Sequence, residues 1–346
     1  MRKNENLGDG KMALENLKET QNNKMTVGFL FEVNKKRLKL ESANGEVGFD
    51  REITDKNIHR PGLALAGYVE LFTYDRVQIF GNTEIRYLNH LTFEERVNAF
   101  KTIFQFDLPC IFVTSENKLD NELIAIATEH HVSVISTPLE TTKFVYFLSD
   151  FLDDHFAPQT VLHGSFIDVY GIGVLITGRS GIGKSEIALD LIERGHRLVA
   201  DDVVMVTRKG EGILIGSGSD VVKNYMEIRG LGLIDVRSIF GIQAIRFQKR
   251  VEVIVELQEW HDKTEYTRTG LDHEEISILG VNLPHIKLPI FPGKNITVIA
   301  EVIALDYLLK QYGYDSAKEF AKRLDAAIAE KTKGKRAINY FGRDFE

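Results

Sequence analysis

The fold is decided by residues 173–195, which read GVLITGRSGIGKSEIALDLIERG. Residues 178–185 match the pattern G-x-x-x-x-G-K-[ST]. The apolar run before them predicts a strand, and apolar residues at helical spacing after them predict a helix that ends at Gly195. A glycine-rich turn at a helix N-terminus supplies the converging backbone N–H groups and the positive dipole end that phosphate oxygens need. We therefore predict a nucleotide phosphate loop between this strand and this helix.

The residues of this loop are the candidate nucleotide ligands: Gly178, Arg179, Ser180, Gly181, Ile182, Gly183, Lys184 and Ser185. The ammonium group of Lys184 would reach the β and γ phosphates, and the hydroxyl of Ser185 would bind Mg²⁺. Roughly 0.02 matches to the pattern are expected by chance in a chain of this length. The sequence therefore favours a nucleotide site over the alternative, a glycine turn that joins strand to helix without a ligand.

Two adjacent aspartates follow on the next predicted strand. Residues 196–206, HRLVADDVVMV, predict one strand that carries Asp201 and Asp202. In a βαβ arrangement this strand commonly lies beside the loop, which would bring one carboxylate to Mg²⁺, to its water or to an acceptor hydroxyl. Neighbouring residues on a strand point to opposite faces, so we expect the two aspartates to differ in role. A solvated acidic pair at a strand end is the alternative.

His163 is a further candidate, on a geometric argument. Residues 166–177 predict a hairpin that pairs Phe166 with Ile176. Continued toward the N-terminus, this register places His163 opposite Arg179 of the loop. A packed or solvated histidine at the start of a strand is the alternative.

Charged groups also lie in later turn-rich segments. Glu227 and Arg229 lie beside two glycines in MEIRGLGLID, which predicts a tight loop with two opposite charges. Arg268 and Lys294 are basic groups in turns, where they would contact phosphate. For Arg268 and Lys294 the residues alone favour solvated loop charges, and contact with phosphate is the alternative.

The first half of the chain alternates between predicted strands and helices. The strands are residues 76–81, 108–114 and 132–137, and the helices are residues 92–106, 119–131 and 141–156. This alternation indicates a compact α/β domain with a mainly parallel sheet and crossover helices. Because no glycine-rich phosphate turn occurs here, we expect a structural or interacting role for this half and no nucleotide site.

The domain boundary is predicted at Pro158, because proline blocks continuation of the preceding helix. Residues 1–24, rich in Asn, Lys and Glu, are expected to be a mobile tail. An N-terminal α/β domain is predicted for residues 25–157 and a C-terminal phosphate-loop domain for residues 158–336. Residues 337–346 are predicted to form a C-terminal tail.

Composition excludes several classes of protein. The chain has 346 residues, 43 of them basic and 50 acidic, for a net charge of −7. No overall positive field draws it to nucleic acid or to anionic lipid. The apolar run 296–305 is too short to span a bilayer and contains Glu301. The single cysteine, Cys110, lies in an apolar run and is expected to be a buried free thiol, which indicates a cytoplasmic protein.

The combination of segments resembles one family closely. VLHGSFIDVYGIGVLITGRSGIGKSE, HRLVADD, MEIRGLGLID and LPIFPGKN are similar to segments of the bacterial HPr kinase/phosphorylase family, and NIHRPGLALAGY is similar to its N-terminal signature. The resemblance runs from Met25 to a last predicted helix, which begins at the capping box of Ser316 and Glu319. It implies that the C-terminal half has a phosphate-loop kinase fold of the phosphoenolpyruvate-carboxykinase-like kind.

The resemblance also implies an activity and partners. Members of the family phosphorylate a regulatory serine of the phosphocarrier protein HPr with ATP or pyrophosphate, and thereby control carbon metabolism. They remove the phosphoryl group by phosphorolysis, in which inorganic phosphate leaves as pyrophosphate. A homohexamer is implied as well, and the terminal helix is implicated in binding HPr.

Site residues are carried over position by position. His163, Lys184, Asp202 and Arg268 resemble catalytic positions, and Asp202 would accept the serine proton and return it in the reverse reaction. The resemblance implies Ser185 and Glu227 as Mg²⁺ ligands. The segment tied to dephosphorylation corresponds to Pro289, Ile290, Phe291, Pro292, Gly293 and Lys294. Arg179 stands where the family often has an acidic residue.

Two other functions are consistent with a phosphate loop. The first is a related kinase that acts on a small metabolite, and the second is an adaptor that binds ATP without transferring a phosphoryl group. Phosphorylation of serine in HPr, of a metabolite, or of neither would separate the three.

Overall fold

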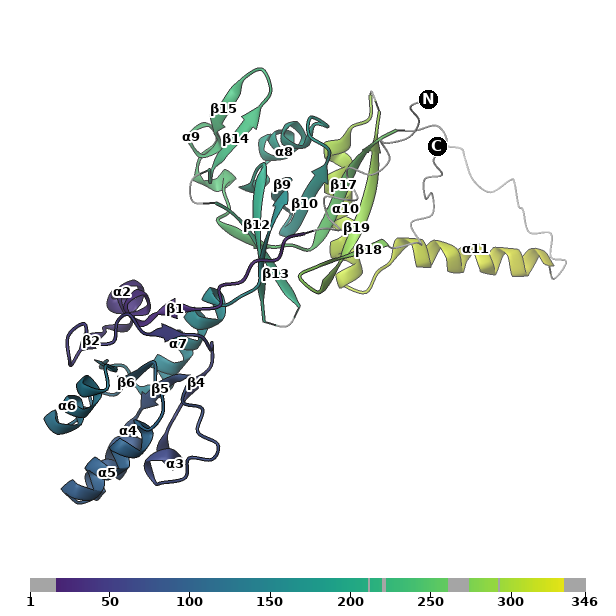
Figure 1. The fold of residues 1–346 in the computed structure, drawn as a ribbon. Coiled ribbons are helices and arrows are strands. Elements are labelled where there is room, and N and C mark those ends of the chain that lie inside the picture. The colour runs from purple at the N-terminus through teal and green to yellow at the C-terminus, as the bar shows by residue number, and fades with distance from the viewer. Residues whose placement is uncertain (1–16, 211, 220–221, 261–273, 292, 333–346) are drawn as a thin grey trace, which may run out of the picture. The chain divides into compact units, whose positions relative to one another are not determined.

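The computed structural model describes residues 17–210, 212–219, 222–260, 274–291 and 293–332. The chain divides into two compact units (Figure 1). The N-terminal unit comprises residues 20–158, and the C-terminal unit comprises residues 159–346 together with residues 1–19. No helix in these described ranges is long and apolar enough to cross a membrane.

A five-stranded sheet forms the centre of the N-terminal unit. In spatial order its strands are β2 (Glu41–Ser42), β7 (Ser133–Ser136), β6 (Cys110–Val113), β5 (Val77–Phe80) and β4 (Ile58–His59). β4, β5, β6 and β7 are parallel, and β2 is antiparallel to β7. All residues of β5 and β6 are buried, as in a parallel sheet that is covered on both faces. β1 (Met25–Thr26) and β3 (Glu52–Ile53) form a separate antiparallel pair.

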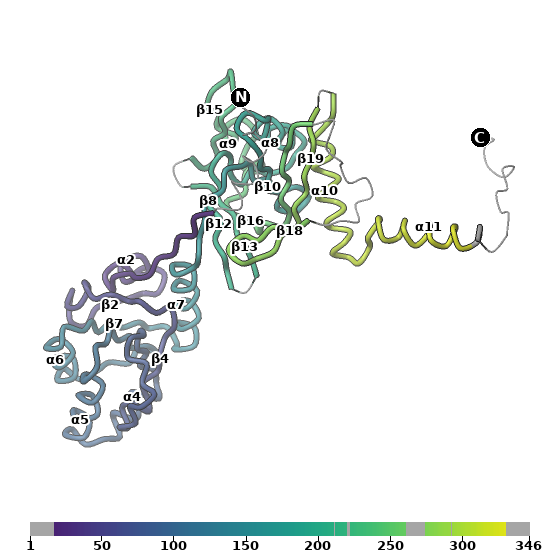
Figure 2. The backbone as a smooth tube through the Cα atoms, turned by 45° about the vertical axis from the view of Figure 1, so that its right-hand side comes forward, coloured from purple at the N-terminus to yellow at the C-terminus, as the bar shows by residue number. Residues whose placement is uncertain are grey.

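Helices cover both faces of this sheet. One hydrophobic core takes side chains from α3 (Gly62–Leu65), α4 (Asn82–His90), α5 (Phe93–Ile103) and α6 (Asn121–Glu129). The other core takes side chains from α2 (Val27–Leu38) and α7 (Thr141–His155). Figure 2 shows α2 and α5 on opposite sides of the strands. The strands and helices predicted for this half are confirmed, but α4, a short polar segment, is not predicted by the sequence pattern.

The thiol of Cys110 lies in the core beneath α2 and α7. It is free and fully buried, and this burial raises its pKa. The prediction of a buried free thiol is confirmed.

A six-stranded sheet forms the centre of the C-terminal unit. In spatial order its strands are β11 (Arg197–Ala200), β9 (Ser165–Val169), β10 (Ile172–Gly178), β17 (Val253–Glu259), β19 (Val281–Ile290) and β18 (Glu274–Ile278). β10, β17 and β19 are parallel, and the other pairs are antiparallel. The carboxyl ends of β10, β17 and β19 therefore lie at one edge of the sheet.

This sheet is covered on both faces. α8 (Lys184–Glu193) and α10 (Ile296–Gln311) share one hydrophobic core with it. On the other face lies a four-stranded antiparallel sheet with the order β16 (Gln248–Arg250), β13 (Ile213–Gly218), β12 (Val203–Lys209) and β8 (Gln159–His163). The two sheets approach closely at Gly216, where a Cβ would lie 2.5 Å from the ring of Phe166.

The remaining elements of the C-terminal unit are short or peripheral. They are the antiparallel pair β14 (Tyr225–Ile228) and β15 (Gly232–Asp235), then α9 (Val236–Phe240), a 3-10 helix (Ile242–Ala244) and α11 (Ser316–Thr332). α11 projects from the body of this unit in Figure 1, and its apolar residues Phe320, Leu324 and Ile328 are exposed.

The hairpin before the phosphate loop differs from the predicted register by one residue. β9 and β10 pair Phe166 with Leu175, because a two-residue turn at Tyr170 and Gly171, both with positive φ, closes the hairpin. The chain also bends at Gly164, so His163 belongs to β8 and pairs with Val203 of β12. The predicted pairing of His163 with Arg179 is therefore wrong.

The strand predicted for residues 196–206 is split into β11 and β12. Asp202 adopts a left-handed conformation with φ 64°, which breaks a continuous strand. β11 is not the neighbour of β10, because β9 lies between them. Both aspartates therefore lie at a strand junction rather than within one strand.

Part of the predicted N-terminal tail makes defined contacts. Within residues 17–24, the side-chain amide of Gln21 donates a hydrogen bond of 2.8 Å to the carbonyl oxygen of Phe156. Residues 17–24 form no helix, but this contact holds Gln21 to the end of α7. The prediction of a mobile tail is therefore wrong for this part. Residues 1–16 and the predicted tail 337–346 lie outside the described residues.

Candidate functional site

The phosphate loop joins β10 to α8, as the sequence predicts. Gly178, Gly181 and Gly183 have φ values of 134°, 79° and 99°, which side chains rarely adopt. A Cβ at Gly178 would also lie 2.7 Å from the carbonyl oxygen of Leu257 in β17. α8 begins at Lys184 without a side-chain cap, which leaves its first backbone N–H groups without a side-chain acceptor. This is the backbone arrangement that binds phosphate oxygens.

The side chain of Lys184 folds back over the loop. Its Nζ lies 3.1 Å from the carbonyl oxygens of Gly178 and Arg179. Partial burial lowers the pKa of Lys184, and the negative charges of Asp201 and Asp202 oppose that effect. The ammonium group is thus held against the loop backbone, within the electrostatic influence of both carboxylates.

Asp201 accepts hydrogen bonds from two serine hydroxyls. Ser185 Oγ lies 2.9 and 3.1 Å from its two carboxylate oxygens, and Ser165 Oγ lies 2.5 Å from Oδ1. The backbone N–H of Glu227 also interacts with this carboxylate. Burial raises the pKa of Asp201, and these hydrogen bonds offset the effect only in part. Of the two aspartates, Asp201 is therefore the one that faces Ser185.

The β14–β15 hairpin brings a second basic group to the loop. Arg229 follows β14 directly, and its Nη2 lies 3.4 Å from Ser180 Oγ. Its guanidinium lies so close to Gly181 that a Cβ there would be 2.5 Å from Nη1. The hairpin contacts α8, and from it Arg229 reaches the loop while the backbone N–H of Glu227 interacts with Asp201. The local pattern predicts a charged tight turn here, and only the family resemblance, through Glu227, links this turn to the phosphate loop; the contact of Arg229 with the loop is not predicted.

Asp202 and His163 lie on the neighbouring corner of the fold. Asp202 is exposed, and its charge acts on Lys184. The carbonyl oxygen of Asp202 accepts a hydrogen bond of 3.1 Å from the N–H of Gly164, the residue after His163. His163 is exposed and pairs with Val203, the residue after Asp202. His163 and Asp202 are thus brought together by the pairing of β8 with β12, and not by the predicted pairing of His163 with Arg179.

Arg179 forms an ion pair with Glu259, at the end of β17. Both side chains are substantially exposed. The positive charge of Arg179 is therefore balanced by the carboxylate of Glu259 at the edge of the sheet.

The segment Pro289–Lys294 follows the same edge. Pro289 and Ile290 end β19, which is two strands from β10 in the sheet. Lys294 donates a hydrogen bond of 2.9 Å to the carbonyl oxygen of Pro289, and its Nζ lies 5.3 Å from the ring centre of Phe291. Burial lowers the pKa of Lys294. The segment thus presents one ammonium group beside an aromatic ring at the edge that carries the loop.

Two of the predicted site residues, Arg268 and Pro292, lie outside the described residues. In the part of the chain that is described, no group of three His, Cys, Asp or Glu side chains is arranged to hold a metal ion.

The residues around Ser185 nevertheless fit a Mg²⁺ ion that is shared with a phosphate ligand. Mg²⁺ is commonly bound by one or two carboxylates together with substrate phosphates and waters. Ser185 supplies a hydroxyl, and Asp201 supplies a buried carboxylate that contacts it. Because burial disfavours the ionised form of Asp201, a nearby cation would stabilise that form. Glu227, whose backbone touches Asp201, offers a second carboxylate.

Comparison with known proteins gives the same assignment over nearly the whole chain. The family described as HPr Serine kinase C-terminal domain matches residues 154–324, and that described as HPr Serine kinase N terminus matches residues 25–152. An HPr kinase/phosphorylase of Chloroherpeton thalassium is 56% identical, over 93% of this chain and 96% of that protein. An HPr kinase/phosphorylase of Prosthecochloris aestuarii is 53% identical, over the same shares of the two chains.

A solved structure is also similar in part. The Hpr(Ser) kinase/phosphatase from Coxiella burnetii is 39% identical, with a TM-score of 0.42, and covers 46% of this chain and 97% of that one. Because both halves match their family and the relatives cover nearly the full length, the chain belongs to the HPr kinase/phosphorylase family.

Proposed function

We propose that the site around the phosphate loop transfers a phosphoryl group from ATP or pyrophosphate to a serine of HPr, and removes it by phosphorolysis. The observation that carries the proposal is the grouping of Lys184, Ser185, Asp201 and Arg229 about one loop. Phosphoryl transfer asks a protein mainly for positioning and for neutralisation of charge. This grouping supplies both.

In the forward reaction the chain holds the donor and prepares the acceptor. The loop N–H groups, Lys184 and Arg229 bind the phosphate oxygens and stabilise the charge that builds on them. Asp202 accepts the proton of the serine hydroxyl as its oxygen attacks the terminal phosphorus. ADP leaves when ATP is the donor, and inorganic phosphate leaves when pyrophosphate is the donor.

The reverse reaction uses the same groups. An oxygen of inorganic phosphate attacks the phosphorus of phosphoserine, the bond to the serine oxygen breaks, and pyrophosphate forms. Asp202 returns its proton to the serine oxygen, as microscopic reversibility requires. His163, beside Asp202 in the fold, is proposed to act with it, and Lys294 to bind phosphate in this direction. Arg268 keeps its proposed catalytic role on the resemblance alone.

Mg²⁺ is the proposed cofactor. Ser185, Asp201 and Glu227 would hold it, and when bound it would neutralise charge on the phosphates. Asp201 is not among the ligands that the family resemblance implies, and its contact with Ser185 supports adding it.

The partners and setting follow the family. HPr is the proposed protein substrate, the assembly is proposed to be a homohexamer, and the location is proposed to be cytoplasmic, which the free buried thiol of Cys110 supports. The two alternatives, a small-metabolite kinase and an adaptor that binds ATP without transfer, gain no support from the family assignment.

The proposal is tested with radiolabelled ATP and purified HPr. Asp202→Asn is expected to bind nucleotide but to transfer no phosphate to serine, because the amide accepts no proton. Asp75→Asn, an exposed aspartate of the N-terminal unit, is the matched control and should transfer normally. Unchanged transfer by Asp202→Asn would remove its role as the base.

A further inference from the structure

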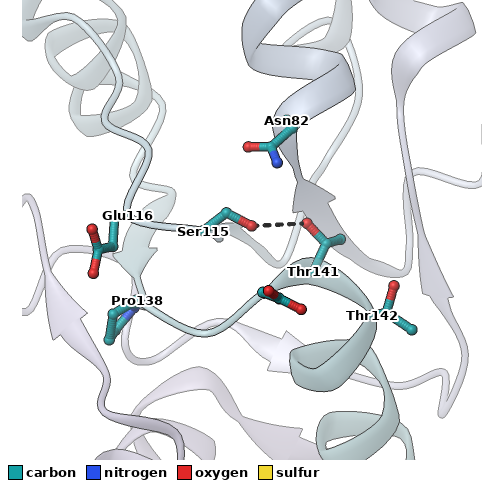
Figure 3. A pocket seen from close by; sticks show the side chains of 7 residues that line it. Asn82, Ser115, Glu116, Pro138, Thr141 and Thr142 are labelled. Atoms are coloured by element: carbon teal, nitrogen blue, oxygen red, sulfur yellow. Dashed lines mark hydrogen bonds between the residues drawn. The ribbon is translucent and has the colours of Figure 1, made fainter.

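The N-terminal unit contains a cavity of about 420 Å³ at the carboxyl edge of its parallel sheet. It is lined by Asn82, Ser115, Glu116, Pro138, Glu140, Thr141 and Thr142. These residues come from the chain segments that follow β5, β6 and β7, and Figure 3 shows the Ser115 and Thr141 side chains pointing toward one another. Ligand sites commonly have volumes of roughly 300–1,000 Å³. The cavity is therefore large enough for a small molecule.

The topology of the sheet explains why the cavity lies here. The loop after β6 leads to α6, which packs on one face, while the loop after β7 leads to α7, which packs on the other face. Adjacent parallel strands whose connections leave to opposite faces open a crevice between their carboxyl ends. In open α/β sheets this crevice is where ligands bind. The cavity occupies this position between β6 and β7.

The lining is almost entirely polar and rich in hydrogen-bonding groups. The Ser115 and Thr141 hydroxyls lie 3.4 Å apart, and Thr141 Oγ1 is 2.7 Å from Thr114 Oγ1. Asn82 Oδ1 accepts a hydrogen bond from Asn117, which leaves the amino group of Asn82 as a donor. α7 begins at Thr141 without a side-chain cap, which adds backbone N–H donors. These groups match a ligand that both donates and accepts many hydrogen bonds.

The charges of the lining select against a strongly anionic ligand. Glu116 and Glu140 are exposed on the cavity wall, and none of the lining residues is basic. The guanidinium of Arg60, which lies behind Gly81, already donates to the buried carboxylate of Glu84 at 2.8 Å. Two carboxylates repel a phosphate but accept hydrogen bonds from hydroxyl groups, and such charge-assisted bonds are the stronger kind.

We propose that this cavity binds a polyhydroxylated ring of monosaccharide size, with Glu116 and Glu140 accepting hydrogen bonds from its hydroxyls. Asn82, Ser115 and Thr142 donate to hydroxyl oxygens of the same ligand. The shared chemistry is a ring with vicinal hydroxyls, which occurs both in free sugars and in the ribose of a nucleoside. All residues of the site belong to the N-terminal unit, and none of them belongs to the phosphate loop.

The test is saturation-transfer NMR and calorimetry on the full chain. D-glucose, D-fructose and D-ribose form one arm, and uridine and adenosine form the other. We expect at least one of these compounds to bind. The double variant Glu116→Gln with Glu140→Gln is expected to weaken that binding at least tenfold. Glu129→Gln, an exposed glutamate of α6, is the matched control and should bind as the unaltered chain does.

Three results would overturn the proposal. They are the absence of binding by every compound, unchanged affinity in the double variant, and tighter binding of glucose 6-phosphate than of glucose. Glutamine keeps the shape of these exposed side chains, so an unchanged melting temperature is expected and is measured for each variant. Thr142→Val removes a hydroxyl at the exposed start of α7. This variant is expected to weaken binding independently of the two glutamates.

Discussion

Arg229 offers the sharpest test of how the phosphate site is built. Its guanidinium reaches from the turn after β14 to the loop, with Nη2 at 3.4 Å from Ser180 Oγ and with Nη1 close to the backbone of Gly181. A phosphate held by the loop N–H groups would lie within reach of this group. Replacement by alanine removes a charge and its donors and leaves the backbone of the loop in place.

The expected loss follows from the energy of one charge-assisted hydrogen bond. Such a bond contributes about 1.5–3 kcal/mol. Because about 1.4 kcal/mol corresponds to a factor of ten, Arg229→Ala should lower kcat/KM for phosphorylation of HPr roughly 10- to 150-fold. The kcat/KM of Arg229→Lys should lie between those of the unaltered chain and Arg229→Ala, because lysine keeps the charge but not the planar fork of donors. Stability should change by less than about 0.5 kcal/mol, since Arg229 is exposed.

The assay measures the initial rate of phosphoserine formation in HPr and of pyrophosphate formation in the reverse direction. Both rates should fall, because the same phosphate site serves both directions. Arg86→Ala, an exposed arginine of α4, removes an equal charge from the N-terminal unit and should leave both rates within about twofold. Rates in Arg229→Ala equal to those of the control would refute the reasoning.

Two further predictions concern stability. Burial raises the pKa of Asp201 above its ordinary value of 3.8, so the folded chain binds the extra proton and loses stability as pH rises through the raised pKa. Asparagine has no such proton to lose. Without Mg²⁺, the melting temperature of Asp201→Asn minus that of the unaltered chain should therefore increase as pH rises from 4 to 7. A difference that stays constant over this pH range would contradict the burial argument. Gly178→Ala places a Cβ 2.7 Å from a carbonyl oxygen at φ 134°, and should cost about 1–3 kcal/mol in urea unfolding, whereas an unchanged midpoint would contradict that clash.

The sequence predicts those parts of the fold that depend on local pattern. The phosphate loop, its strand and its helix follow from a fixed spacing of glycines beside apolar runs. The helices and strands of the N-terminal half follow from their periodicity in the same way. Cys110 is correctly expected to be buried, because its whole segment is apolar. In each of these cases the signal lies within one short stretch of chain.

The differences arise where conformation or distant contacts decide the structure. The left-handed conformation of Asp202 splits a stretch that reads as one apolar strand, and no periodicity reveals it. The hairpin register depends on whether the turn has two residues, which shifts every pair by one. Arg229 reaches the loop only because β14 and β15 fold back on α8, far along the chain. Neighbouring aspartates cannot be told apart until the backbone shows which one faces Ser185.

The cavity in the N-terminal unit was missed for a related reason. The sequence of this half lacks a glycine-rich turn, and glycines are the local mark of a phosphate site. A crevice at the carboxyl ends of parallel strands depends instead on which face each connecting helix packs against. That choice is made by the cores around α6 and α7 and not by a motif.

The most direct measurement of the central claim is calorimetric titration of the full chain with ATP and with pyrophosphate in the presence of Mg²⁺. The unaltered chain should bind both, and Lys184→Ala should bind them at least about tenfold more weakly, because a charge-assisted contact of about 1.5–3 kcal/mol is lost. The absence of binding heat in the unaltered chain, or equal affinity in Lys184→Ala, would contradict the assignment of the loop as the phosphate site.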